Sequence, residues 1–186
     1  PHLTLATPRP LSIGLGTFQI HYLAGTLAQS AFFPHPTEHP NRLAVGVVGS
    51  FVPRAIDGLE IGALKWNEMW MPSAVTWSEL SRPFTGGFNR NFGTGSENLN
   101  VTGDNGMASA FFRWVLPKSG VELFGEIYRE DYAGDLRTFL EQPDDLSSYM
   151  VGMQWASVRM SDHIRVVRAE VVNGQLAHAS QHQAVC

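Results

Sequence analysis

Apolar residues recur at every second position through much of the chain, in runs bounded by Gly, Pro, Asn or Asp. Period-two alternation is typical of a β-strand whose two faces meet different surroundings, and the bounding residues favour turns. The pattern therefore predicts an all-β chain. Its expected strands are seven in number, near residues 11–25, 42–52, 59–67, 107–116, 121–130, 147–158 and 163–173.

The segment 121–130 shows the alternation most clearly. Leu123 and Ile127 fall on one face of the expected strand, whereas Glu122 and Glu126 fall on the other, because successive side chains of a strand point to opposite sides. One face of the predicted sheet is therefore apolar, and the other carries charge.

The connections between these strands alternate between long and short. The long ones span residues 26–41, 68–106 and 131–146, and the short ones span 53–58, 117–120 and 161–162. Short connections join antiparallel neighbours, and outer-membrane barrels have short turns at one end and long loops at the other. A soluble sandwich or lipocalin shares the strand period but has no general reason to collect its long loops at one end. The pattern favours an antiparallel up-and-down meander that is part of a large transmembrane β-barrel.

Two stretches of the long loops are predicted to form short helices. In residues 135–141, three apolar side chains recur at helical spacing, with Asp135 as N-cap and Pro143 beyond the end. Residues 73–80 form a weaker candidate, bracketed by prolines. Both helices are expected to lie in extracellular loops, and neither changes the fold class.

The composition excludes one class of partner and is consistent with a membrane surface. The 186 residues include 13 basic and 17 acidic side chains, a formal net charge of −4, which argues against a broad basic surface for nucleic acid. Charged residues make up only 16% of the chain, against roughly a quarter in soluble domains. This low fraction is explained if much of the outer surface faces lipid.

Residues 43–52 form the most apolar run, which is half the roughly 20 residues that a transmembrane helix needs but long enough for a membrane strand of about 9 to 11. The single cysteine, Cys186, excludes an internal disulfide framework and a cysteine-rich metal site. We expect residues 1–186 to be an interior part of a longer barrel that lacks its signal peptide. The tail after residue 173 fits the strand pattern poorly.

The chain from residue 125 to residue 149 carries a distinctive set of residues: Gly125, Glu126, Arg129, Asp131, Asp135, Leu136, Arg137, Phe139, Pro143, Asp144 and Tyr149. With these residues, the segment 107–155 resembles the Wzi family of capsule assembly proteins of the bacterial outer membrane. Members of that family carry a strand ending in Gly-Glu-aromatic-x-Arg, then an Asp-Leu-Arg helix, a Pro-acid turn and a strand that begins near Tyr. Thr138 departs from the family, which often has an acidic residue there.

The resemblance implies a monomeric barrel of about 18 strands that retains capsular or related extracellular polysaccharide at the cell surface. It implies glycan binding without a reaction, and it implies no cofactor. This chain would supply about seven of the strands, with outer-membrane lipid around them.

Glycan binding uses aromatic rings, planar polar side chains and cations that pair with sugar carboxylates. The candidates in the expected loops are Trp70, Trp77, Asn89, Arg90, Arg129, Asp131 and Arg137. Each type has a structural alternative: the tryptophans suit an interfacial aromatic girdle, and the two arginines nearest the helix suit local ion pairs with Asp131 or Asp135 that order the loop.

A further set of polar side chains shares the faces opposite the apolar ones and is expected to face the barrel lumen. Its members are Glu60, Arg113, Glu122, Glu126, Tyr128, Arg168 and Glu170. Such carboxylates keep a barrel interior wet, and we expect them to pair with Arg113 or Arg168 on nearby strands.

The sequence is compatible to different degrees with three other functions. A porin-like channel for small polar solutes shares the fold. A glycoside hydrolase using Glu126 with Glu122 or Glu130 has a reachable carboxylate spacing, but acid and base must flank the sugar, and these side chains point the same way. The paired histidines at 35 and 39 and at 178 and 182 have helical metal-ligand spacing, but prolines or a missing acidic residue argue against a metal site.

Overall fold

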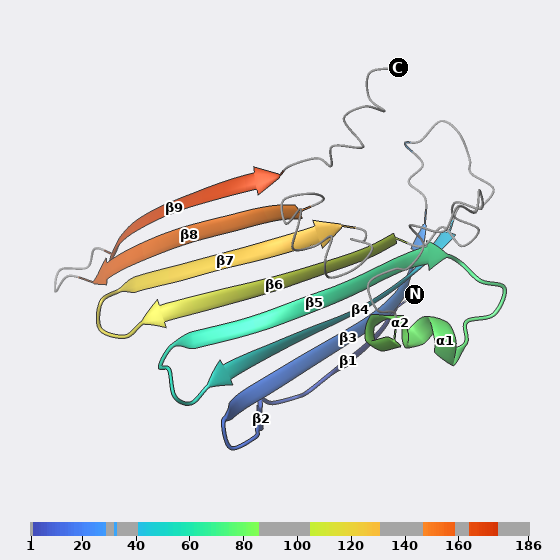
Figure 1. Ribbon diagram of the computed structural model, residues 1–186, viewed down its shortest axis with the longest axis horizontal. Helices are drawn as coiled ribbons and strands as arrows, with labels where there is room; N and C mark the ends of the chain where they lie inside the picture. The colour runs from blue at the N-terminus through green and yellow to red at the C-terminus, as the bar shows by residue number, and fades with distance from the viewer. Residues whose placement is uncertain are drawn as a thin grey trace, which may run out of the picture.

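In the computed structural model, which describes residues 2–28, 32, 41–85, 105–130, 147–158 and 164–174, the protein is a single antiparallel sheet of nine strands with two short helices on one face (Figure 1). The elements are β1 (His2–Ala6), β2 (Leu11–Ser12), β3 (Gly16–Ala28), β4 (Asn41–Pro53), β5 (Leu59–Trp70), α1 (Trp77–Leu80), α2 (Arg82–Thr85), β6 (Asn105–Leu116), β7 (Val121–Glu130), β8 (Ser147–Val158) and β9 (Ile164–Gly174).

From β3 to β9 each strand pairs with the next one along the chain, so the sheet is a meander. β1 and β2 both pair with β3 and follow one another along its free edge. The all-β antiparallel meander predicted from the period-two pattern is confirmed. The sheet is open, with β1 and β9 at its two outer edges.

The number of strands and two strand boundaries were predicted wrongly. Seven strands were expected, whereas the described residues form nine, and β1 matches none of those expected. Residues 11–25 are not one strand, because the chain reverses at Gly14, whose φ of +79° suits glycine. The amide of Ile13 donates to the carbonyl of Gly16 at 3.0 Å, and β2 then lies back against β3. At the other end of the sheet β5 continues to Trp70, where a loop was expected.

The register divides the strand residues between two faces, because alternate residues of every strand share a side. The apolar face is defined by Leu3, Leu5, Phe18, Ile20, Tyr22, Leu43, Val45, Val47, Phe51, Leu59, Ile61, Ala63, Met69, Ala110, Phe112, Trp114, Leu123, Ile127, Tyr149, Val151, Met153, Trp155, Val167 and Val171. The polar face is defined by Gln19, His21, Arg42, Ser50, Glu60, Trp66, Glu68, Trp70, Ser109, Phe111, Arg113, Glu122, Phe124, Glu126, Tyr128, Ser148, Gln154, Arg168 and Glu170.

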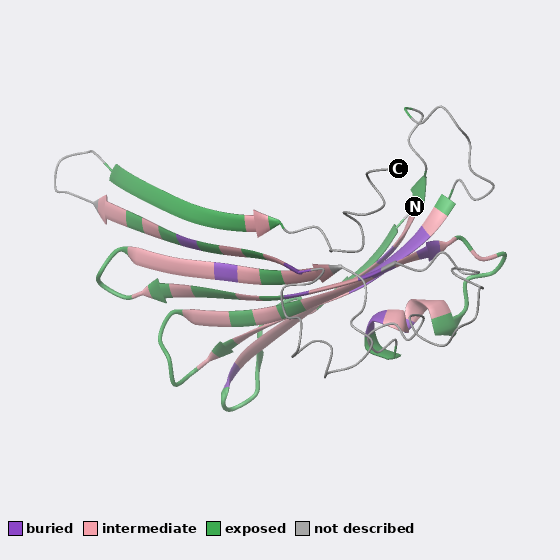
Figure 2. Ribbon diagram, turned by 45° about the horizontal axis from the view of Figure 1, so that its top comes forward, coloured by how far each residue is buried: buried purple, intermediate pink, exposed green. Residues whose placement is uncertain are grey.

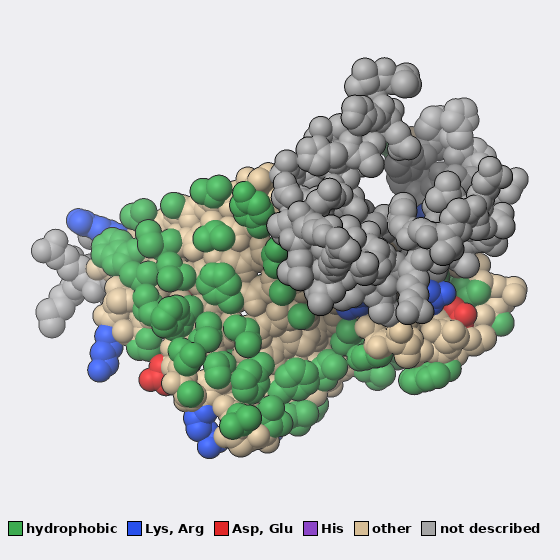
Figure 3. All heavy atoms as spheres, in the orientation of Figure 1, with side chains coloured by type: hydrophobic (Ala, Val, Ile, Leu, Met, Phe, Trp, Pro, Cys, Tyr) green, Lys and Arg blue, Asp and Glu red, His purple; other side chains and the backbone are tan. Residues whose placement is uncertain are grey.

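Within the described part of the chain, much of the apolar face is exposed. Val151 of β8 is 56% exposed although β7 and β9 flank it on both sides, and Ile61 and Ile127 are 44% and 45% exposed in equally internal strands. Figure 2 shows few buried positions toward the short turns, and Figure 3 shows hydrophobic side chains gathered over the strands on the face turned to the viewer. A large uncovered apolar patch of this kind marks an interaction surface.

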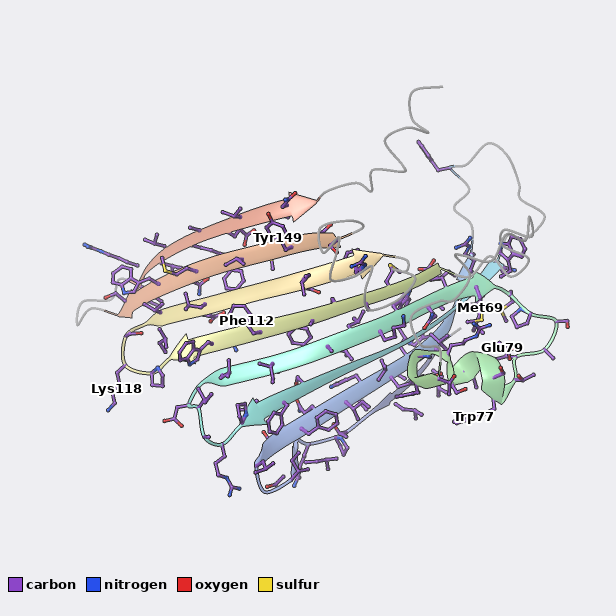
Figure 4. All side chains as sticks on the ribbon, in the orientation of Figure 1. Met69, Trp77, Glu79, Phe112, Lys118 and Tyr149 are labelled. Carbon is purple, nitrogen blue, oxygen red and sulfur yellow. The ribbon has the colours of Figure 1, made fainter. Side chains whose placement is uncertain are left out.

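The two helices cover the apolar face at its long-loop end (Figure 4). Leu80 and Tyr22 pack against the small buried cluster formed by Ala24, Leu43, Val45 and Met69. The helix expected at residues 73–80 is found, but shorter, as α1, and α2 follows it immediately. The expected helix at 135–141 lies outside the described residues. None of the described helices is both long and apolar enough to cross a membrane.

The strand ends on both sides of the sheet shift in one direction between β3 and β9. One row of paired residues across the sheet includes Phe18, Phe112 and Val151. Counted from this row, the end of the strand at the short turns is two residues away in β3 (18 to 16), four in β6 (112 to 116) and seven in β8 (151 to 158). The long-loop ends shift the same way, from ten residues in β3 to three in β9. The strands are therefore oblique to the lines that join their ends.

Aromatic rings lie over glycines of the neighbouring strand on both faces. On the polar face Trp66 covers Gly46, Phe111 covers Gly62 and Phe124 covers Gly152, each directly across the register. A Cβ added to any of these glycines would lie 2.2 to 2.3 Å from a ring carbon. Each glycine thus makes room for a ring that lies against the sheet.

Two glycines with positive φ provide a matched test of the short turns. Gly58 (φ +75°) would place a Cβ 1.9 Å from the carbonyl oxygen of Val115, whereas Gly14 (φ +79°) has open space around it. We expect Gly14→Ala to lower the free energy of unfolding by about 1 to 2 kcal/mol, the cost of left-handed backbone in alanine. We expect Gly58→Ala to lower it by about 2 to 5 kcal/mol, because an overpacking cost is added.

Urea unfolding of the full-length protein, followed by tryptophan fluorescence, measures both values. Equal losses for the two variants would contradict the close approach of Val115 to the turn.

Candidate functional site

Charged side chains gather on the polar face toward the short-turn end of β6, β7 and β9. Arg113 donates two hydrogen bonds to Glu122, from Nε at 3.0 Å and from a terminal nitrogen at 2.9 Å. The two residues lie diagonally across the β6–β7 pair, where the guanidinium fork meets both carboxylate oxygens. This geometry gives a charge-assisted pair with a fixed orientation.

Arg168 of β9 continues this cluster. Its guanidinium donates to Glu170 at 2.8 and 3.1 Å and lies 4.7 Å from the ring centre of Phe124. The register joins Glu122 to Gln154 and Gln154 to Arg168 in one row. The carboxylate of Glu122 therefore lies between Arg113 and Arg168. With Glu170 and the ring of Phe124, these side chains form a patch in which positive, negative and aromatic groups alternate across the strands.

A second group of polar side chains lies at the long-loop end of β4 and β5. The indole nitrogen of Trp66 donates to Glu68 at 3.0 Å, and Arg42 approaches Glu68 at 3.6 Å. Trp66 lies over Gly46, so the ring rests against the sheet and its orientation is fixed by the carboxylate. An oriented ring beside a carboxylate and a guanidinium combines the apolar and polar contacts that a sugar requires.

The carboxylates of the polar face are poorly arranged for glycoside hydrolysis. Glu122 and Glu126 project from the same face of one strand, whereas a hydrolase needs its acid and base on opposite sides of the scissile bond. The fork of Arg113 also occupies both oxygens of Glu122. Within the described ranges, no three His, Cys, Asp or Glu side chains gather as a metal site would need.

The structure separates the residues expected to bind glycan. Trp70 ends β5 on the polar face, next to Arg42 in the register. Arg129 lies in β7 on the apolar side of the sheet, in the same row as Lys65, and Trp77 begins α1 over that same side. Asn89, Arg90, Asp131 and Arg137 lie outside the described residues.

The residues expected to face a lumen come together. Glu60, Arg113, Glu122, Glu126, Tyr128, Arg168 and Glu170 all lie on the polar face. The expected pairing of these acids with arginine is present as the Arg113–Glu122 pair.

The sequence interpretation missed the group around Trp66 and Glu68. It ended the strand at residue 67 and treated what followed as loop. Extending the alternation from Glu60 through every second residue reaches Trp66, Glu68 and Trp70. The signal was present as a continued period of two, whereas the partner Arg42 depends on the register of β4 with β5.

The helical pair α1–α2 is ordered by its own polar contacts. Thr76 caps α1 by accepting from the amide of Ser78 at 3.2 Å, and Glu79 accepts from the amide and hydroxyl of Thr76 at 2.8 and 2.5 Å. These bonds from Thr76 hold the pKa of Glu79 below its usual value. Tyr22 then ties the pair to β3 by donating to the carbonyl of Leu80 at 2.8 Å.

Comparisons with protein-family models, curated proteins and solved structures found no match for this chain.

We expect the Arg113–Glu122 pair to contribute little to stability, because its side chains are 54% and 23% exposed. A double-mutant cycle with Arg113→Met and Glu122→Gln should give a coupling free energy of about 0.2 to 1 kcal/mol, falling as salt is added. Urea unfolding of the full-length protein measures it. A cycle of Arg113 with Glu126, which is not bonded to it, provides the control. Equal coupling in the two cycles would contradict the observed pairing.

Proposed function

We propose that the chain forms part of an outer-membrane β-barrel that holds capsular or related extracellular polysaccharide at the surface of a bacterial cell, by binding and without catalysis. The apolar face contacts lipid in this proposal, and the polar face lines the lumen. The main support for a membrane location is that one face of the sheet is apolar and exposed while the other carries charged side chains.

The contrast favours a membrane over a soluble sandwich for a physical reason. A sandwich would cover its apolar face with a second sheet, yet Val151 and Ile127 remain about half exposed in internal strands. Charged residues instead gather on the opposite face, at Glu60, Arg113 and Glu126 among others. Apolar-out and polar-in alternation is the signature of membrane barrels.

The stagger of the strand ends supports the same proposal. Over the six steps from β3 to β9 the ends shift by five residues on one side and seven on the other. With about 3.3 Å per residue and 4.8 Å between strands, this shift corresponds to a tilt of about 30 to 40°. Strands in membrane barrels tilt by roughly 35 to 45°, because closure requires a sheared register.

The polysaccharide part of the proposal is supported by the Wzi resemblance and by the side chains of the polar face. Trp66 lies flat beside Glu68 and Arg42 near the long-loop end, where a glycan at the cell surface would arrive first. Arg113 and Arg168 place cations further along the same face. Rings and cations together suit an acidic polysaccharide.

One observation favours a channel as the second candidate. The alternating charges of Arg113, Glu122, Arg168 and Glu170 resemble the wet interior of a porin more than a closed binding site. Planar-bilayer recordings separate the two functions. Steady large openings that soluble oligosaccharide leaves unchanged would favour a channel for small solutes.

Lysine substitutions at two adjacent residues, on opposite faces of β7, test the membrane location. We expect Ile127→Lys to impair insertion, because a lysine facing hydrocarbon costs about 2 to 4 kcal/mol near the midplane. Glu126→Lys should insert normally, because its side chain faces water. Both variants are expressed as full-length protein in cells whose own gene is deleted, and the outer-membrane fraction is assayed for each.

The same cells test the polysaccharide function. Deletion should release capsule into the medium, and the wild-type gene should restore its retention, whereas Ile127→Lys should not. Equal insertion of the two lysine variants would contradict the membrane assignment. Unchanged retention in the deletion strain would contradict the polysaccharide role and leave the barrel intact.

A further inference from the structure

The helical pair α1–α2 lies on the apolar face but carries large apolar side chains that the sheet does not cover. Trp77 is 79% exposed and Phe84 is 62% exposed. Both belong to a segment fixed in place: Tyr22 donates to Leu80 at 2.8 Å and stacks with Phe84 at 6.1 Å between ring centres. The exposed rings are therefore held in a defined position at the long-loop end of the sheet.

We propose that the helical pair anchors this end of the sheet in the head-group layer of the membrane, with Trp77 and Phe84 in contact with lipid. The inference rests on the proposed membrane location of the apolar face. Of the two roles that the sequence offers for Trp77, glycan binding and an interfacial aromatic girdle, this proposal selects the second.

The position of the helical pair on the apolar face is the first reason to expect lipid around Trp77 and Phe84. Leu80 packs beside Leu43, Val45 and Met69, which are apolar-face residues at the long-loop ends of β4 and β5. The pair is thus on the side of the sheet that would meet lipid, and at one border of it. A glycan in the lumen would lie on the opposite side of the strands.

The distribution of aromatic residues is the second argument. At the short-turn end of the apolar face the strands themselves carry Trp114 and Trp155. At the long-loop end, β4 and β5 carry Leu43 and Met69 at the corresponding positions. Membrane proteins place aromatic side chains at both interfaces, and α1–α2 supplies them where these strands do not.

The polar contacts of the pair suit the same layer. Thr76 and Glu79 satisfy the free amides at the start of α1, and the O–H of Tyr22 is bonded to a backbone carbonyl. Two very short helices that keep polar groups paired while exposing aromatic rings fit a head-group layer, which accepts both kinds of group.

Depth-dependent quenching tests the proposal on the full-length protein in phosphatidylcholine and phosphatidylglycerol vesicles. In a Cys186→Ser background, Trp77→Cys, Val151→Cys and Glu126→Cys are each labelled with bimane. The lipids carry a nitroxide either near the glycerol or near the methyl end of the acyl chain. We expect the label at 77 to lose more emission to the shallow nitroxide, the label at 151 to the deep one, and the label at 126 to neither.

The outcomes separate this inference from the membrane proposal. Quenching at 151 without quenching at 77 would overturn the helical anchor and leave the barrel. Absence of quenching at both positions would overturn the membrane location itself. Phe84→Cys provides a second position on the pair, and it should behave like 77 even if replacement of Trp77 disturbs α1.

Discussion

The whole structure depends on one constraint: a sheet with an apolar face must have something other than water against that face. Val151 and Ile61 lie in internal strands and are still about half exposed. Among the residues that the structure describes, α1 and α2 cover the long-loop end of this face. With roughly 25 cal/mol for each Å² of apolar surface exposed to water, this arrangement is unfavourable in an aqueous setting. In the proposed barrel, lipid against the apolar face removes this cost, and the polar face meets water.

This constraint explains features that look independent. The stagger of the strand ends follows if both ends must lie in parallel interfaces while the strands tilt. Paired charges such as Arg113 and Glu122 lie on the polar face, whereas two cations of the apolar face, Lys65 and Arg129, share one row near its long-loop end. Glycines such as Gly46 and Gly62 let rings lie against the sheet, so bulky side chains occupy the polar face without projecting far from it.

Much of the fold could be predicted from the sequence, because a period of two is a local signal. It identified the strands from β4 to β9 and assigned residues such as Glu60 and Arg168 to one face. The period did not predict where the chain reverses. Leu11 continues the alternation of the following residues, but it lies in a separate strand, β2, because the chain turns back at Gly14. The group around Trp66, and the position of α1 over Met69, depend on register and loop path, which no local period encodes.

The most direct test of the two-faced sheet is a nitroxide scan along residues 122–127 of β7 in the full-length protein, reconstituted in vesicles. Collision rates with oxygen, which concentrates in lipid, and with a water-soluble nickel chelate are measured at each position. A sheet with one face in lipid and the other in water should give oxygen maxima at 123, 125 and 127 and nickel maxima at 122, 124 and 126. Nickel access at the odd positions, or no alternation, would contradict this arrangement.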